Sequence, residues 1–217
     1  MSAAGEDEAA DFDGLARAYR WLEYATFGPI LERCRFEHLP SLRDRRRALI
    51  LGDGDGRFTA QLMAEAPALE ADCVDASAGM LGLLKQRAPR ARVQRADIRR
   101  LTPAGVGYDL VATHFFLDCL TQEEMRALIA RVAPRLAPGA LWVVSEFAVP
   151  ERGALRPTAR ALIAALYRAF RLLTGLRVDR VPDYASALSA SGFRPMAVRA
   201  RLWGLLRSEL WSASRAT

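Results

Sequence analysis

From residue 48 onward, short apolar segments alternate with stretches in which apolar residues recur at helical spacing. The run Ala48–Leu51 is followed by a glycine cluster and then by apolar residues at helical spacing from Phe58. The same order of strand, loop and helix repeats along the chain. The predicted strands cover residues 48–51, 71–74, 91–94, 108–113 and 140–147. Strands that alternate with helices in this way predict right-handed βαβ units in a doubly wound, mainly parallel α/β sheet.

Several local signals fix where the later elements begin. Ser77 is placed to cap a helix, and Thr121 to Glu124 form a capping box at the start of another. Pro138-Gly139 predicts a turn just before the strand 140–147. Residues 183–191 are predicted to form a short helix, and segments 193–200 and 205–211 a final hairpin.

Two further segments are not needed by such a sheet. Residues 12–39 are aromatic-rich and helical in spacing, with a break at Gly28-Pro29. Residues 155–173 predict a helix whose apolar arc is too wide for packing on one side. We therefore divide the chain into a flexible acidic tail, residues 1–11, and a single domain, residues 12–217, that includes an inserted helix at 151–175.

Length and composition fit this single domain. The chain has 217 residues, of which 51% are hydrophobic and 26% charged, and these values exclude a disordered or coiled-coil protein. No apolar run approaches the roughly 20 residues of a membrane-spanning helix, and the acidic N-terminus lacks the apolar region of a signal peptide. We expect a cytoplasmic protein. Its three cysteines are widely spaced and are expected to be free thiols.

Charge is unevenly distributed. Residues 1–13 contain five acids and no base, so the remainder carries 31 bases against 20 acids. A basic body permits anionic partners, but the bases are spread along the chain instead of interleaving with aromatic residues in one stretch. Nucleic acid is therefore not the expected partner.

The sharpest motif is Gly52-Asp53-Gly54-Asp55-Gly56, directly after the first predicted strand. Glycines here allow a tight turn and let a ligand lie against main-chain amides at a helix N-terminus. The dinucleotide fingerprint places its third glycine one residue later, where this chain has Arg57. Asp53 and Asp55 would also repel a pyrophosphate, so the motif weighs against an NAD or nucleotide-sugar enzyme.

Acidic residues follow the next two predicted strands. Asp75 stands at the end of the second strand, where an acid in this fold accepts hydrogen bonds from ribose hydroxyls. Asp97 follows the third strand. Either residue alone could be a helix cap or a loop residue. Together with the glycine motif they lie at the carboxyl ends of strands, where α/β sheets bind ligands.

On these motifs the chain resembles the class I S-adenosylmethionine-dependent methyltransferases, over about residues 40–200. The matching segments are ALILGDGDGRF, ADCVDASAGML, RADIRRL, YDLVATHFFLDCLT and LAPGALWVVSEF. The resemblance implies a seven-stranded sheet with an antiparallel last strand and S-adenosylmethionine as cofactor. It also implies the cofactor-binding residues. Gly52, Gly54 and Gly56 pass under the methionine, Asp75 binds the ribose, and Asp97 and Ile98 frame the adenine, with Ala76 and His114 as further cofactor contacts.

The chain departs from the family at Ile50, where an acid is common, and Asp53 is the candidate substitute near the methionine ammonium. The segment Phe12 to Tyr19 is similar to the entry segment of quinone-type and other small-molecule methyltransferases, which implies that Tyr19 covers the donor. In that group, substrate lids come from this segment and from the insertion after strand five. We expect residues 12–39 and the inserted helix to form a lid over an apolar acceptor pocket. Packing against each other or against a dimer partner is the alternative.

Two residues are candidates for acid–base chemistry. His114 immediately follows the fourth predicted strand, and Asp118 lies four residues later. Each could take a proton from an acceptor, and each could equally serve structure, as a hydrogen-bonded histidine or a helix cap. No metal site is expected.

The expected activity is methyl transfer to an apolar small molecule. The segment His114-Phe115-Phe116-Leu117 differs from the Asn/Asp-Pro-Pro-aromatic motif of enzymes that methylate nucleic-acid amines. The alternatives are a noncatalytic S-adenosylmethionine-binding partner subunit and an RNA or protein methyltransferase. A homodimer and a peripheral membrane contact through the arginines of residues 155–173 are also open.

Overall fold

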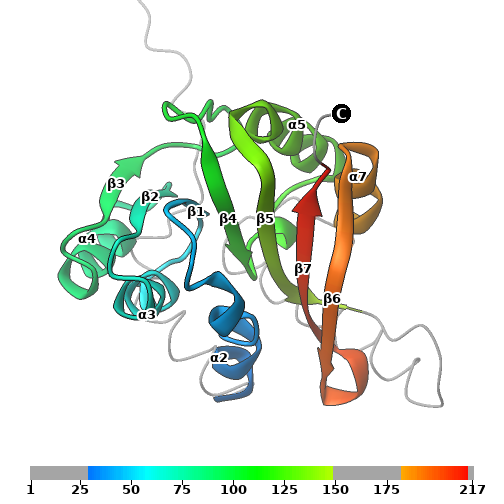
Figure 1. Ribbon diagram of the computed structural model, residues 1–217, viewed down its shortest axis with the longest axis horizontal. Coiled ribbons are helices and arrows are strands. Elements are labelled where there is room, and N and C mark those ends of the chain that lie inside the picture. Colours follow the sequence, from blue (N-terminus) through cyan, green and yellow to red (C-terminus); the bar gives the residue numbers. More distant parts are fainter. Residues whose placement is uncertain (1–28, 149–181, 215–217) are drawn as a thin grey trace, which may run out of the picture.

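One twisted sheet carries helices on both of its faces (Figure 1). The computed structural model describes residues 29–148 and 182–214. The strands are β1 (Arg47–Leu51), β2 (Glu70–Asp75), β3 (Arg92–Arg95), β4 (Tyr108–His114), β5 (Leu136–Phe147), β6 (Phe193–Arg201) and β7 (Leu206–Ala213). The α-helices are α2 (Pro29–Arg35), α3 (Arg57–Glu65), α4 (Ala78–Arg87), α5 (Gln122–Val132) and α7 (Tyr184–Ala190). Short 3-10 helices occupy η1 (Leu39–Leu42), η2 (Leu117–Cys119), η3 (Ala133–Arg135) and η4 (Leu202–Gly204).

The strand order of the seven-stranded sheet is β3-β2-β1-β4-β5-β7-β6. Strands β1 to β5 pair in parallel, and β7 pairs antiparallel with both β5 and β6. The chain leaves β1 toward β2 and returns to β4 on the other side of β1, so the order reverses between β1 and β4. This confirms the predicted doubly wound sheet with an antiparallel last strand.

The sheet separates two buried apolar layers. One layer lies under α5 and α7, and the other lies under η1, α3 and α4. Alternation along β5 sends Trp142 toward α5 and Val143 toward α3. The indole Nε1 of Trp142 donates to Thr113 Oγ1 at 3.1 Å, and its ring meets Phe193 edge-on. The same alternation places Glu146 on the α5 side, at the carboxyl end of β5.

The predicted helix caps are confirmed. Ser77 Oγ accepts the N–H of Met80 at the start of α4, and Thr121 forms the full capping box of α5 with Glu124. Asp183 caps α7 by accepting the N–H of Ser186. These short polar side chains define the helix starts because they satisfy amides that have no partner within the helix.

One boundary differs from the prediction. Strand β5 begins at Leu136, so it runs through Pro138-Gly139 where the sequence predicts a turn. Leu136 pairs with Tyr108, and the register then shifts before Leu110 pairs with Leu141. Gly139 has φ 73°, and this conformation takes up the irregularity without ending the strand.

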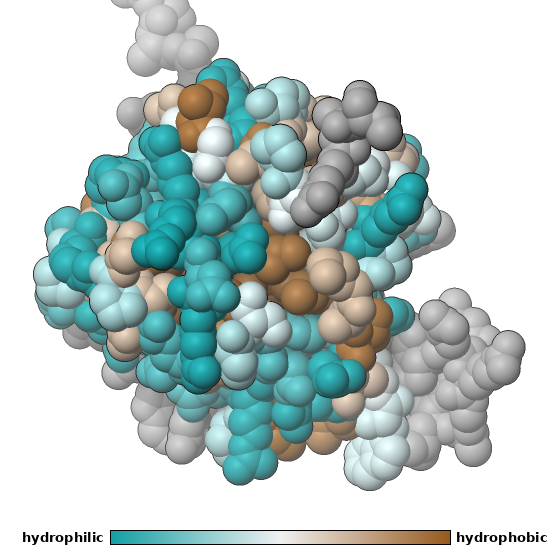
Figure 2. All heavy atoms as spheres, in the orientation of Figure 1, coloured by the Kyte–Doolittle hydropathy of each residue, from teal (hydrophilic) through white to brown (hydrophobic). Residues whose placement is uncertain are grey.

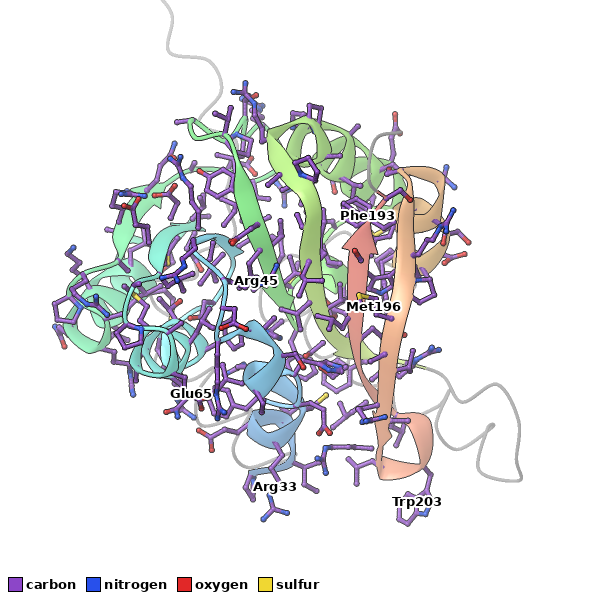
Figure 3. All side chains as sticks on the ribbon, in the orientation of Figure 1. Arg33, Arg45, Glu65, Phe193, Met196 and Trp203 are labelled. Atoms are coloured by element: carbon purple, nitrogen blue, oxygen red, sulfur yellow. The ribbon has the colours of Figure 1, made fainter. Side chains whose placement is uncertain are left out.

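The last two strands form the predicted hairpin. Trp203 lies at its tip with 78% of its surface exposed, and Figure 3 shows it pointing away from the sheet. Met196 is also exposed, on the edge strand β6 beside a register shift at Pro195. Figure 2 shows mostly hydrophilic side chains over α3 and α4 and a small apolar group near the centre of this face.

The predicted tail at residues 1–11, the part of the lid at 12–28 that holds Tyr19, and the helix at 155–173 lie outside the described residues. Of the predicted N-terminal pair of helices, α2 (Pro29–Arg35) lies within the described residues. Among residues 29–148 and 182–214, no helix is long and apolar enough to cross a membrane.

Candidate active site

The glycine motif forms the loop between β1 and α3. Gly52, Gly54 and Gly56 have φ values of 67°, 60° and 81°, a region that favours glycine. A Cβ at Gly52 would lie 2.2 Å from the ring of Phe116, and one at Gly56 would lie 2.7 Å from the Cα of Leu84. At Gly54 the nearest atom would be 3.9 Å away. The loop is therefore packed at its two ends and open at Gly54, where a ligand can approach the backbone.

The side chain of Asp53, a residue of this loop, bonds to Thr59 of α3. Its Oδ2 accepts the backbone N–H of Thr59 at 2.9 Å and the Thr59 hydroxyl at 2.6 Å. The side chain is buried, and its Oδ1 has no hydrogen-bond partner in the described structure. Burial raises the pKa of Asp53, and the nearby Arg35 opposes that rise. The carboxylate thus holds the start of α3, and its predicted contact with a methionine ammonium stays a prediction.

Asp75 and Asp97 lie at neighbouring strand ends. Asp75 ends β2, is partly exposed, and accepts the N–H of Ser77 through Oδ1. Ala76 follows it, and its carbonyl accepts from Arg95 Nε at 3.1 Å. Asp97 follows β3, with its side chain 45% exposed, and accepts the N–H of Arg99. Partly exposed carboxylates at this edge can accept bonds from the hydroxyls of a sugar.

Ile98 is oriented differently from Asp97. It is 5% exposed and belongs to the apolar layer on the α5 side, together with Val74 and Leu101. The structure thus places the predicted adenine pair at the end of β3 with its acid outward and its aliphatic residue inward.

His114 ends β4 and is 3% exposed. Its Nδ1 lies 2.9 Å from Ser145 Oγ, and its ring lies 4.2 Å from the ring of Phe58. The Ser145 hydroxyl also lies 3.3 Å from the carbonyl of Cys34 and 3.0 Å from Ser208 Oγ, and when it donates to either of these its oxygen accepts from Nδ1–H. Nε2 is then the basic nitrogen, and it has no hydrogen-bond partner in the described structure. Burial, with Arg35 and His38 nearby, holds the pKa of His114 well below its usual value, so the ring is neutral.

Asp118 lies in η2, on the α5 side, and accepts a weak bond from Cys119 Sγ at 3.6 Å. Its charge acts on Glu146, a residue that the sequence analysis did not select. Glu146 is 1% exposed, and its Oε1 accepts the N–H groups of Phe116 at 3.0 Å and Leu117 at 2.7 Å. Burial and the charge of Asp118 raise the pKa of Glu146 well above its usual value.

Glu146 had a visible signal in the sequence. It follows Trp142 and Val144 at alternate positions of the most apolar strand, where an inward-facing residue is expected to be apolar. A charged residue at such a position predicts a buried polar contact. The positions of Arg35 and Phe116 carried no comparable signal, because each depends on contacts between distant segments.

The comparisons with known proteins agree with this geometry. Residues 48–139 match the family described as methyltransferase domain. This match covers less than half of the chain, and it supports a methyltransferase domain at residues 48–139. The matched residues include the glycine loop, Asp75 and Asp97, and S-adenosylmethionine is the cofactor of this family.

Solved structures show that the fold extends over most of the chain. The S-adenosylmethionine-dependent methyltransferase SibL superposes with a TM-score of 0.66 at 20% identity, covering 92% of this chain and 57% of that chain. The mitomycin 7-O-methyltransferase MmcR superposes with a TM-score of 0.69 at 17% identity, covering 94% of this chain and 60% of that chain. The N-methyltransferase NodS from Bradyrhizobium japonicum superposes with a TM-score of 0.60 at 17% identity, covering 86% of this chain and 98% of that chain. No curated protein matched by sequence.

The chain spans less than two thirds of SibL and MmcR, so these likenesses establish the fold of the methyltransferase domain. The residues present fit the cofactor. Gly54 leaves its backbone approachable, and Asp75 offers a carboxylate at the adjacent strand end. When bound, S-adenosylmethionine supplies an electrophilic methyl group. Within the described residues, no cluster of acidic, histidine or cysteine side chains could hold a metal ion.

Proposed function

We propose that this chain transfers a methyl group from S-adenosylmethionine to a small molecule with an apolar body. The observation that carries the proposal is an apolar cluster at the carboxyl ends of β4 and β5. The rings of Phe115 and Phe147 lie 5.3 Å apart there. The cluster consists of Leu31, Cys34, Phe115 and Leu206, with Ile30, Phe147 and Leu202 partly buried against it.

An apolar wall at this place suits both the acceptor and the reaction. Methyl transfer from a sulfonium is an in-line displacement, in which alignment of donor and acceptor provides much of the catalysis. Apolar side chains exclude water from the acceptor and favour an acceptor with an apolar body. A group that removes a proton is needed only when the acceptor atom must lose one.

His114 is the favoured proton acceptor. It lies on the same side of the sheet as the apolar cluster, because Ser145 joins it to Cys34 of α2. Its ring is neutral and its buried Nε2 has no hydrogen-bond partner in the described structure, so this nitrogen is available to accept a proton. Asp118 lies on the opposite side, near Glu146, and is the second candidate.

The first experiment measures binding and turnover separately. Calorimetric titration with S-adenosylhomocysteine and with NADH tests the cofactor, and we expect binding of the former alone. Release of S-adenosylhomocysteine in the presence of apolar phenols, quinols and aromatic amines then tests the acceptor class. Transfer to RNA or protein, with no small molecule accepted, would overturn the acceptor class.

The variant His114→Gln examines the proposed base. We expect turnover to fall about 10²–10⁴-fold while affinity for S-adenosylhomocysteine stays nearly intact. Equal turnover of variant and wild type from pH 5 to 9 would return His114 to a structural role. Binding of the cofactor without turnover on any acceptor would favour the noncatalytic partner subunit. A cytoplasmic setting, a dimer and a membrane contact stay predictions.

A further inference from the structure

The ring of Phe116 lies directly against the backbone of Gly52. A Cβ built on Gly52 would fall within 2.2 to 2.9 Å of three atoms of that ring, so only glycine fits. Gly52 is the first residue after β1, and Phe116 is the second residue after β4. The ring therefore spans the junction between β1 and β4, where the strand order reverses and where sheets of this type bind ligands.

The position of this ring is imposed by its backbone. Phe115 has φ 52°, and its side chain turns into the apolar cluster with Leu31 and Leu206. Phe116, the next residue, packs instead against the layer on the α5 side. Its N–H and that of Leu117 both donate to Glu146 Oε1. Glu146 thus fixes the segment that carries the ring.

The order of strand ends indicates which part of the cofactor meets Phe116. This step depends on the proposed function. Asp97 and Asp75 follow β3 and β2, and they are the expected contacts of adenine and ribose. The sulfur is attached to the ribose, and its methyl group must face the acceptor side at β4 and β5. The path from Asp75 to β4 crosses the end of β1, where Gly52 and Phe116 lie.

The sulfur of S-adenosylmethionine is a cation, whereas that of S-adenosylhomocysteine is neutral. The face of an aromatic ring attracts a desolvated cation. We propose that Phe116 contacts the sulfonium of S-adenosylmethionine and that Glu146 is the positioning residue that holds its ring there. The contact favours the methyl donor over the demethylated product and so assists product exchange.

The ratio of two dissociation constants tests this role. Calorimetry on the whole chain measures the affinity of wild type, Phe116→Leu and Phe116→Tyr for both forms of the cofactor. In Phe116→Leu we expect the affinity for S-adenosylmethionine to fall about fivefold more than the affinity for S-adenosylhomocysteine. Phe116→Tyr keeps an aromatic face and should keep the wild-type ratio. An equal loss for both ligands in Phe116→Leu would show that the ring only fills space beside Gly52.

Glu146 is tested by a conservative pair of variants. In Glu146→Gln the amide oxygen can still accept the two N–H groups, so the wild-type ratio should persist. Glu146→Leu removes the acceptor. Like Phe116→Leu, it should weaken binding of S-adenosylmethionine more than binding of S-adenosylhomocysteine, which lowers the ratio of the dissociation constant of S-adenosylhomocysteine to that of S-adenosylmethionine. If Glu146→Leu does not fold, Glu146→Gln decides, because a lowered ratio there would overturn the positioning role. Wild-type protein that binds neither ligand would overturn the proposed function itself, whereas binding with an unaltered ratio in every variant overturns this inference alone.

Discussion

The loops after β1 and after β4 are both held by a buried carboxylate, but in different electrostatic surroundings. Asp53 accepts two bonds from Thr59 on one oxygen, and Glu146 accepts two backbone N–H groups on one oxygen. The second oxygen of each is buried and has no hydrogen-bond partner in the described structure. Asp53 has the cation Arg35 nearby, whereas Glu146 has the anion Asp118.

This difference separates two uses of a buried acid. The charge of Asp53 is partly compensated, and its bonds hold the start of a helix. For Glu146, burial and the charge of Asp118 act in the same direction, and its bonds hold the start of η2, the segment that carries Phe116 and Asp118. Buried charges are costly unless they are paired. A strand end that retains a buried acid beside a second acid therefore indicates a segment whose position matters more than its stability.

The largest expected effect comes from adding a Cβ at Gly52, where the loop after β1 meets the ring of Phe116 in the loop after β4. Gly52→Ala would place a Cβ 2.2 Å from the Phe116 ring in a backbone with φ 67°. We expect a loss of about 3 kcal/mol or more in the free energy of unfolding, measured by urea denaturation. Gly54→Ala is the matched control, because its Cβ has 3.9 Å of room and suffers mainly the backbone strain of about 1–2 kcal/mol. Equal losses in the two variants would contradict the contact.

A second effect distinguishes the buried acids from the partly exposed Asp75. Asp75→Ala should weaken binding of S-adenosylhomocysteine by about 1.5–3 kcal/mol, because two charge-assisted bonds to ribose hydroxyls are lost. Asp97→Ala is expected to cost less. Calorimetry measures both, and an unchanged dissociation constant in Asp75→Ala would remove the ribose assignment.

Much of this site was predictable from the sequence, because its main signals are local. Gly52, Asp75 and Asp97 follow short apolar runs, and a parallel sheet brings such strand ends to one edge. The roles of His114 and Asp53 could not be read in this way. The direction of each side chain depends on the twist and packing of its strand end, here against Phe58 for His114 and beneath the helix start at Thr59 for Asp53.

The third effect concerns the pH dependence of stability. The folded protein holds a proton on Glu146 above the usual glutamate pKa of 4.5, while the unfolded chain releases it. The bound proton therefore contributes to the free energy of unfolding. The contribution is fully present below pH 4.5 and is lost as the pH rises through the raised pKa of Glu146 in the folded state. Glu146→Gln should therefore be more stable than wild type by about 1 kcal/mol or more at pH 8, and this advantage should vanish near pH 4.

Asp53→Asn is the matched comparison for that measurement. Its amide would place a donor near Arg35, so we expect a smaller gain at pH 8 or none. Denaturation curves at pH 4, 6 and 8 measure both variants. A gain in Asp53→Asn as large as that in Glu146→Gln would show that Arg35 does not compensate Asp53.

The smallest effect uses cysteines that lie beside the two carboxylates. Cys73 Sγ lies 3.6 Å from Thr59 Oγ1, and Cys119 Sγ lies 3.6 Å from Asp118 Oδ1. Burial raises the pKa of Cys73 to about 12 and that of Cys119 well above its usual value, so both should react slowly with a thiol reagent at pH 8. Opening the first loop with Asp53→Ala should speed labelling of Cys73 alone, and Glu146→Leu should speed labelling of Cys119 alone. Mass spectrometry of labelled peptides separates the sites, and simultaneous acceleration of both would mean that the two loops open as one unit.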